Sequence, residues 1–119
     1  MVNTNQALDD IKSAIIDRLA SKYTHFAVGT GTTQDSSSDT ALENEVFRDT
    51  IDEVQTSSNS VLFRCYLGTT EANGNAITEF GIFDSDSGGT MLFRKVFPAI
   101  NKTSDMDIWF ELEEVVNVS

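Results

Sequence analysis

The sequence predicts an α+β fold that is mainly β, in which an N-terminal amphipathic helix packs on a small antiparallel β-sandwich or open barrel. Three observations lead to this class. Apolar residues recur at helical spacing near the N-terminus, apolar and polar residues alternate in the second half, and turn-forming residues separate the alternating segments. The length of 119 residues suits one domain, with the helix in residues 1–22 and a β-rich body in residues 23–119.

The N-terminal helix is predicted from an apolar stripe. The members of this stripe follow helical spacing and are Ala7, Leu8, Ile11, Ala14, Ile15 and Leu19. Ile16 lies at the edge of the stripe and widens it, and Asn3 is the expected N-cap. Such a helix either packs on its own domain or docks on a neighbouring subunit, and both interpretations stay open.

A short strand is expected over residues 23–28, and the segment from Gly29 to Gly31 ends it. The two glycines complete neither a dinucleotide-binding motif nor a P-loop, and a bound phosphate would face a strongly acidic chain. We therefore interpret them as strand-ending residues. Residues 34–39, which include three consecutive serines, are expected to form a solvated loop.

The region after this loop shows weaker patterns. Asp39 is expected to cap a short helical turn that includes Leu42 and ends near Glu45. Residues 48–56 have little periodicity and are predicted as one polar edge strand.

Four strands are predicted in the rest of the chain, over residues 61–67, 76–83, 90–97 and 108–118. Residues 71–75 read as a turn, and the segment from Asp84 to Gly89 reads as a hairpin loop. Pro98 stops the third of these strands or places it at a sheet edge, because proline cannot donate a ladder hydrogen bond.

The single cysteine and the single histidine restrict the available chemistry. One cysteine excludes an intrachain disulfide framework and a cysteine-rich zinc site, and one histidine excludes a His-rich metal site. Cys65 shares an apolar strand face with Phe63 and Leu67, so we interpret it as a buried small hydrophobic residue and not as half of a dyad with His25.

The loop from Asp84 to Gly88 resembles the opening of a calcium-binding loop, which usually needs a later bidentate glutamate. No glutamate follows at the required distance, so we interpret the loop as a hairpin turn, with adventitious binding of Ca²⁺ or Na⁺ as the alternative. Paired carboxylates are common in so acidic a chain and carry no hydrolase signal. No catalytic, cofactor-binding or metal-binding residue is predicted, and the chain is not expected to be an enzyme.

Trp109 is the only tryptophan and occupies an ambiguous place in the last strand. The period of two puts Trp109 opposite Phe110 and on the polar side with Glu111. It is therefore either a second-layer core residue packed under the helix or an anchor at a subunit interface.

The charge balance limits the partners. There are 19 Asp and Glu residues against 8 Lys and Arg, a formal net charge of −11, which opposes binding to nucleic acid or anionic membranes. The sequence has no apolar run long enough to span a membrane, and its N-terminus lacks the features of a signal peptide. The acidity has two interpretations: a protein that works in concentrated salt, or an acidic protein that binds a basic partner.

Four segments of the chain form a recognisable series: FAVGTGTT at 26–33, DTALENEV at 39–46, AITEFGIFD at 76–84 and GGTMLFR at 88–94. Together they resemble small tail, tail-fibre and baseplate-type structural proteins of tailed viruses, and the resemblance spans about residues 24–116. The resemblance implies structural roles and no active-site residues. In it, Gly29 and Gly31 shape a loop, Asp39 and Leu42 cap and anchor the short helix, and Glu79, Gly81 and Asp84 frame the hairpin.

Together with the acidity, this resemblance suggests a virion structural protein of a tailed virus that infects a haloarchaeon. We expect a non-enzymatic homo-oligomer in a tail, baseplate or fibre-attachment, collar or capsid-surface (turret) assembly, in contact with other virion proteins and made in the host cytoplasm. The short length favours such a subunit over a complete host-binding fibre. Ile16 and Trp109 are the expected interface residues, and a carbohydrate- or host-receptor-binding module is the alternative function.

Overall fold

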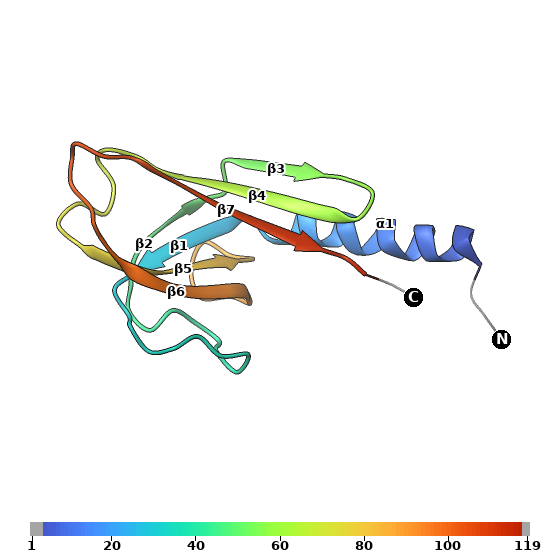
Figure 1. The fold of residues 1–119 in the computed structure, drawn as a ribbon, viewed down its shortest axis with the longest axis horizontal. Coiled ribbons are helices and arrows are strands. Elements are labelled where there is room, and N and C mark those ends of the chain that lie inside the picture. The colour runs from blue at the N-terminus through green and yellow to red at the C-terminus, as the bar shows by residue number, and fades with distance from the viewer. Residues whose placement is uncertain (1–3, 118–119) are drawn as a thin grey trace.

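The computed structural model describes residues 4–117 and has one helix and seven strands in two antiparallel sheets (Figure 1). The elements are α1 (Asn5–Lys22), β1 (His25–Gly29), β2 (Glu45–Thr50), β3 (Glu53–Thr56), β4 (Ser60–Leu67), β5 (Ala76–Phe83), β6 (Met91–Asn101) and β7 (Ile108–Val115). The predicted class is confirmed: the fold is mainly β, sandwich-like and preceded by a helix. Neither sheet closes into a barrel.

The first sheet has the strand order β2-β1-β5-β6, and the second has the order β3-β4-β7. Both strands at the centre of the first sheet are largely buried: β1 from Phe26 to Gly29 and β5 from Ile77 to Phe83. The outer strands β2, β3, β6 and β7 have more exposed residues. Pro98 lies within β6, which runs on to Asn101, so of its two predicted effects the edge position is the observed one.

Aromatic rings join the two sheets. The Phe80 ring from β5 stacks on the Phe110 ring from β7, with centroids 4.8 Å apart and planes 9° from parallel. Phe26 of β1 lies beside Phe80, with centroids 6.3 Å apart. From β4, the alternating residues Val61, Phe63, Cys65 and Leu67 are fully buried, as the sequence predicted. The core therefore lies between the sheets.

The Cys65 side chain is buried, and its thiol is a weak nucleophile at neutral pH. Burial raises the pKa of its thiol to about 12, with a smaller contribution from the Asp52 carboxylate. The nucleophilic thiolate is therefore scarce at neutral pH.

We expect a thiol reagent to label Cys65 slowly in the folded protein and rapidly after unfolding in urea. Cys65→Ser is expected to reduce the free energy of unfolding by about 1–3 kcal/mol, because a buried hydroxyl would lack a partner. Cys65→Ala serves as the control without a polar group. Fast labelling under native conditions would contradict the burial of this strand face.

The helix begins with Thr4, whose Oγ1 accepts a hydrogen bond from the Ala7 backbone N–H at 3.1 Å. The predicted N-cap, Asn3, lies outside the described residues. Figure 1 shows α1 extending well beyond the sheets at one end of a molecule 56 Å long. No helix within residues 4–117 is long and apolar enough to cross a membrane.

The buried side of α1 differs from the predicted stripe. Ile16 is only 4% exposed, whereas Ile11 and Ile15 are 42% and 40% exposed. Ile16 faces the residues that join β3 to β4, and α1 contacts these two strands. The structure thus places Ile16 in the core, and the exposed side of α1 carries Ile11 and Ile15.

Two local predictions between residues 39 and 56 were wrong. No helical turn forms after Asp39, and the expected single edge strand is two strands, β2 and β3, in different sheets. The chain changes sheet between two neighbouring residues: the Ile51 N–H donates to Thr24 O, and the Asp52 N–H donates to Arg64 O. Ile51 packs against the core at this crossing point.

Candidate functional site

The Glu79 carboxylate on β5 is fully buried and holds a distant segment of the chain. Its Oε2 accepts hydrogen bonds from the backbone N–H groups of Gly31 and Asn44, both at 2.8 Å. Its Oε1 accepts from the Glu43 backbone N–H and from Arg94 Nε, both at 2.9 Å. One carboxylate therefore fixes both ends of the loop over residues 30–44.

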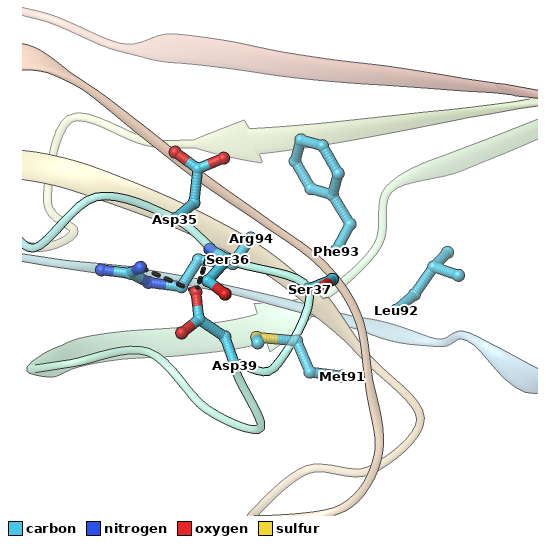
Figure 2. Close-up of a pocket in the computed structure, with 8 residues that line it drawn as sticks. All are labelled: Asp35, Ser36, Ser37, Asp39, Met91, Leu92, Phe93 and Arg94. Carbon is cyan, nitrogen blue, oxygen red and sulfur yellow. Dashed lines mark hydrogen bonds and ion pairs between the residues drawn. The ribbon is translucent and has the colours of Figure 1, made fainter.

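Arg94 on β6 completes this arrangement from the neighbouring strand. Its guanidinium donates to Glu79 Oε1, to Asp39 Oδ2 at 2.9 Å and to the Thr33 carbonyl at 3.0 Å. Figure 2 shows the Arg94 guanidinium directed at the Asp39 carboxylate. Asp39, Glu43, Glu79 and Arg94 are called the clasp below.

Glu43, near the end of this loop, bonds back to residues near its start. Its carboxylate accepts from the backbone N–H groups of Thr32 and Thr33 and from the Thr33 hydroxyl. Within residues 4–117, every buried side-chain nitrogen and oxygen has a hydrogen-bond partner. The clasp is therefore satisfied by the chain itself and leaves no buried polar atom for a ligand.

Glu79 and Arg94 of the clasp stay ionised in spite of their burial. Burial by itself raises the pKa of Glu79, but hydrogen bonds from three backbone N–H groups and from Arg94 outweigh it, and the pKa is lowered. Burial likewise opposes the charge on Arg94, whose pKa is nevertheless raised by Glu79 and Asp39.

We expect stability to decrease in acid because the clasp needs charged carboxylates. The pKa of Glu79 is lower in the folded chain than its ordinary value of 4.5, which describes the unfolded chain. Its contribution is therefore fully present above that pH and is lost as the pH falls through the folded value. Urea unfolding between pH 7 and pH 3 measures this effect, and Glu79→Gln should weaken it. An unchanged pH dependence in that variant would contradict the assignment.

Gly29 and Gly31 are required because the clasp approaches their backbone closely. At either position a Cβ atom would lie 2.5 Å from Glu79 Oε2, which is shorter than any normal contact. Gly81 is less constrained, since its Cβ would lie 2.9 Å from Leu42 Cδ2, the end of a flexible side chain, and 3.1 Å from the Phe93 carbonyl oxygen. The structure thus gives a steric reason for glycine at these positions of the sequence motifs.

The structure brings most of the predicted motif residues together. Gly29, Gly31, Asp39 and Glu79 meet at the clasp. Leu42 and Gly81 lie beside it, where Leu42 packs with Ala27 and Phe83 in a small apolar cluster. Asp84 lies apart and accepts a hydrogen bond from the Thr90 N–H at 2.7 Å across the hairpin loop.

Asp39 has a different role from the predicted helix cap. Its carboxylate accepts from the Ser36 N–H at 2.9 Å and pairs with Arg94, so it closes a loop instead of starting a helix. Within residues 4–117, no group of three or more His, Cys, Asp or Glu side chains is arranged to hold a metal ion.

An open groove of about 350 Å³ runs beside the clasp, between the loop and the start of β6 (Figure 2). Its lining residues are Asp35, Ser36, Ser37, Asp39, Met91, Leu92, Phe93 and Arg94. The Ser36 hydroxyl bonds to the Ser38 hydroxyl, and the Arg94 guanidinium is already engaged by three acceptors. The polar groups of the groove therefore serve mainly to hold the loop.

A second surface lies on the outer side of the β3-β4-β7 sheet. Trp109 is 48% exposed there, and its ring centroid lies 4.9 Å from that of Tyr66 on the paired strand. The Arg64 guanidinium carbon lies 4.6 Å from the Trp109 centroid, and Arg64 also pairs with Glu53 and Glu111. These five residues are called the aromatic face. Trp109 is not the core residue that one interpretation expected.

Sequence reasoning missed Arg94 and Glu43. A signal for Arg94 existed: Glu79 and Arg94 are charged residues within otherwise apolar stretches of two strands joined by a hairpin. Charged residues at such positions are rarely buried unless they are paired, and so each points to the other.

The candidate site is defined by its residues and their geometry. Its two parts are the clasp with its groove and the aromatic face. No protein-family model matches the chain, and no curated protein shows significant sequence similarity to it.

Proposed function

We propose that the chain is a non-enzymatic structural protein in the virion of a halophilic tailed virus. It acts as a symmetric oligomer in a tail, baseplate, fibre-attachment, collar or capsid-surface (turret) assembly. The observation that carries the proposal is the clasp. Most of the motif positions that resemble tail-type structural proteins meet at or beside it in a self-satisfied network, which is the arrangement of a rigid scaffold.

Exposed apolar side chains support the assembly role. Ile11 and Ile15 lie on a helix that extends beyond the sheets (Figure 1), and Trp109 of the second sheet is 48% exposed. Large side chains of this kind are typical anchors of protein–protein contacts.

Two measurements test this function. Light scattering in concentrated KCl should show a defined multimer, either alone or after the neighbouring virion protein is added. Mass spectrometry of purified particles should place the chain in one subassembly at a fixed copy number. A monomer under all conditions, together with absence from particles, would contradict the proposal.

The acidic composition predicts a strong dependence on salt. A net charge of −11 repels itself at low ionic strength, and concentrated salt screens this repulsion. Thermal melts in KCl between about 0.1 and 3 M, over which the Debye length falls from about 10 Å to less than 3 Å, should show a steadily rising midpoint. A flat or falling midpoint would remove the argument for a halophilic source, while leaving the scaffold role in place.

A carbohydrate- or host-receptor-binding module is the second candidate function. The exposed pair of Tyr66 and Trp109 favours it, because sugar rings stack on aromatic side chains of this kind. Trp109 is the sole tryptophan, so its fluorescence reports binding directly. A saturable change in its emission with a host glycan would support this candidate.

A further inference from the structure

We propose that the exposed side of α1 in one copy docks on the aromatic face of the next copy. The resulting contact is head-to-tail, and repetition of it closes a ring when the rotation between subunits allows. This inference rests on the proposed function, of which it names the subunit contact.

The exposed side of α1 combines apolar and positive side chains. Successive helix residues are rotated by about 100°, so Arg18 and Lys22 fall within roughly 60° of Ile15 around the axis, and the partly buried Lys12 lies at the edge of this side, between Ile15 and the buried Ile16. Ile11 lies on the same side. The three acidic residues of the helix fall about 120° or more away from Ile15 and are Asp9, Asp10 and Asp17. We call Ile11, Lys12, Ile15, Arg18 and Lys22 the cationic side.

The helix and the rest of the chain have different charge. Three acidic and three basic residues make α1 neutral, so residues 23–119 carry the whole net charge of −11. Within residues 4–117, Lys12 and Arg18 take part in no ion pair, and Lys22 lies 3.7 Å from Asp84. The helix thus presents cations that have few partners within their own copy.

A shallow groove on the helix provides room for a large side chain. It has a volume of about 350 Å³ and is lined by Ala14, Ile15, Arg18, Leu19, Lys22 and Tyr23. Apolar walls with two cations at the rim suit an aromatic ring that is surrounded by carboxylates.

The aromatic face has these complementary properties. Trp109 and Tyr66 supply exposed rings, and the Tyr66 hydroxyl donates to Asp107 at 2.8 Å. Among residues 4–117, Arg64 is the cation that stacks on this face. The carboxylates on and beside the face outnumber it five to one and are Asp52, Glu53, Asp107, Glu111 and Glu113.

The placement of the two surfaces favours a head-to-tail contact. In Figure 1 the strand β7, which carries Trp109 near its start, begins at the end of the molecule opposite to the free tip of α1. A two-fold contact between two helices would instead bring Lys12, Arg18 and Lys22 of one copy against the same cations of the other. Like charges brought together in this way oppose association.

Complementary variants test the contact. Arg18→Glu damages the cationic side, and Trp109→Ala damages the aromatic face of an otherwise intact copy. Each variant alone should lose the wild-type multimer and show at least a tenfold weaker self-association by light scattering. A mixture of the two should form a dimer and nothing larger, because the helix of the Trp109 variant and the face of the Arg18 variant are both intact.

Exchanging the charges of Arg18 and Glu113 tests whether these two residues face each other across the contact. Glu113→Lys should also weaken assembly, and the double variant Arg18→Glu with Glu113→Lys should regain it. Asp17→Asn changes a charge on the other side of α1 and should assemble like the wild type. The effect of Arg18→Glu should shrink in molar salt, whereas the effect of Trp109→Ala should persist, because salt screens charge and not apolar contact.

The possible outcomes separate this inference from the proposed function. A wild-type multimer that survives both single variants, or a mixture that stays monomeric while both variants are folded by circular dichroism, would overturn the inference and leave the structural role intact. Trp109 emission that responds to a glycan but not to protein concentration would assign the face to receptor binding and overturn the inference. A wild-type chain that never self-associates would overturn the head-to-tail contact, and its detection in purified particles would decide the proposed function separately.

Discussion

Replacing Arg94 by alanine is expected to reduce the free energy of unfolding by about 3–5 kcal/mol. The variant leaves the fully buried Glu79 carboxylate without its counter-ion, and it removes donors from Asp39 and from the Thr33 carbonyl. Because small domains are stable by only about 5–15 kcal/mol, this loss is a large share of the total. Urea denaturation monitored by circular dichroism measures it.

Two matched variants control this experiment. Lys95→Ala removes the exposed cation next to Arg94 and should leave the unfolding midpoint unchanged. Arg94→Lys keeps the charge but cannot reach Glu79, Asp39 and Thr33 together, so it should fall between the wild type and Arg94→Ala. Equal stability of Arg94→Ala and the wild type would show that the clasp adds nothing to the fold.

Phe80→Ala is expected to cost a similar amount, about 3–5 kcal/mol. Phe80 is the ring at which the two sheets meet: it stacks on Phe110 and lies near Phe26 and Phe93. Truncation would leave a cavity between the sheets that the surrounding rings fill only in part.

Calorimetry and urea titration should both report this loss. Phe80→Leu keeps most of the volume and should cost less than about 1.5 kcal/mol. A small effect of Phe80→Ala would mean that the sheets close over the gap and that the aromatic stack is not what joins them.

The strands of the second half were predictable because their signal is local. In β4 the buried residues alternate with residues that are part exposed, and β7 shows the same period with Phe110 inside and Trp109 outside. Such alternation needs no knowledge of the partner strand. The extent of α1 was predictable for the same reason, from its helical spacing.

The buried side of α1 was not predictable from that spacing. The stripe through Ile11 and Ile15 is the more regular one, but Ile16 is the buried residue of the helix, and Leu19 of the stripe packs against the core only at its edge, partly buried. Which side is covered depends on contacts with β3 and β4, which lie far along the chain and leave no pattern in the helix sequence.

The clasp was not predicted from the sequence because the residues that bond to one another in it are far apart along the chain. Asp39 has the sequence surroundings of a helix cap, yet its partner Arg94 lies 55 positions away. The backbone N–H groups of Glu43 and Asn44, which a helical turn would have oriented differently, are taken by Glu79. Long-range hydrogen bonds overrode the local preference at this loop.

The position of β1 between β2 and β5 has a consequence for synthesis of the chain. β1 emerges from the ribosome long before β5, and the hydrogen bond from Arg94 to Thr33 spans 61 positions. Because the ribosome adds about 5–20 residues per second, roughly 3–12 s pass between the synthesis of Thr33 and the synthesis of Arg94, the last residue of the clasp. During that interval the first apolar strand has an open edge that can pair with other chains. Only a chain that has been made as far as Arg94 can bury Glu79 together with its counter-ion.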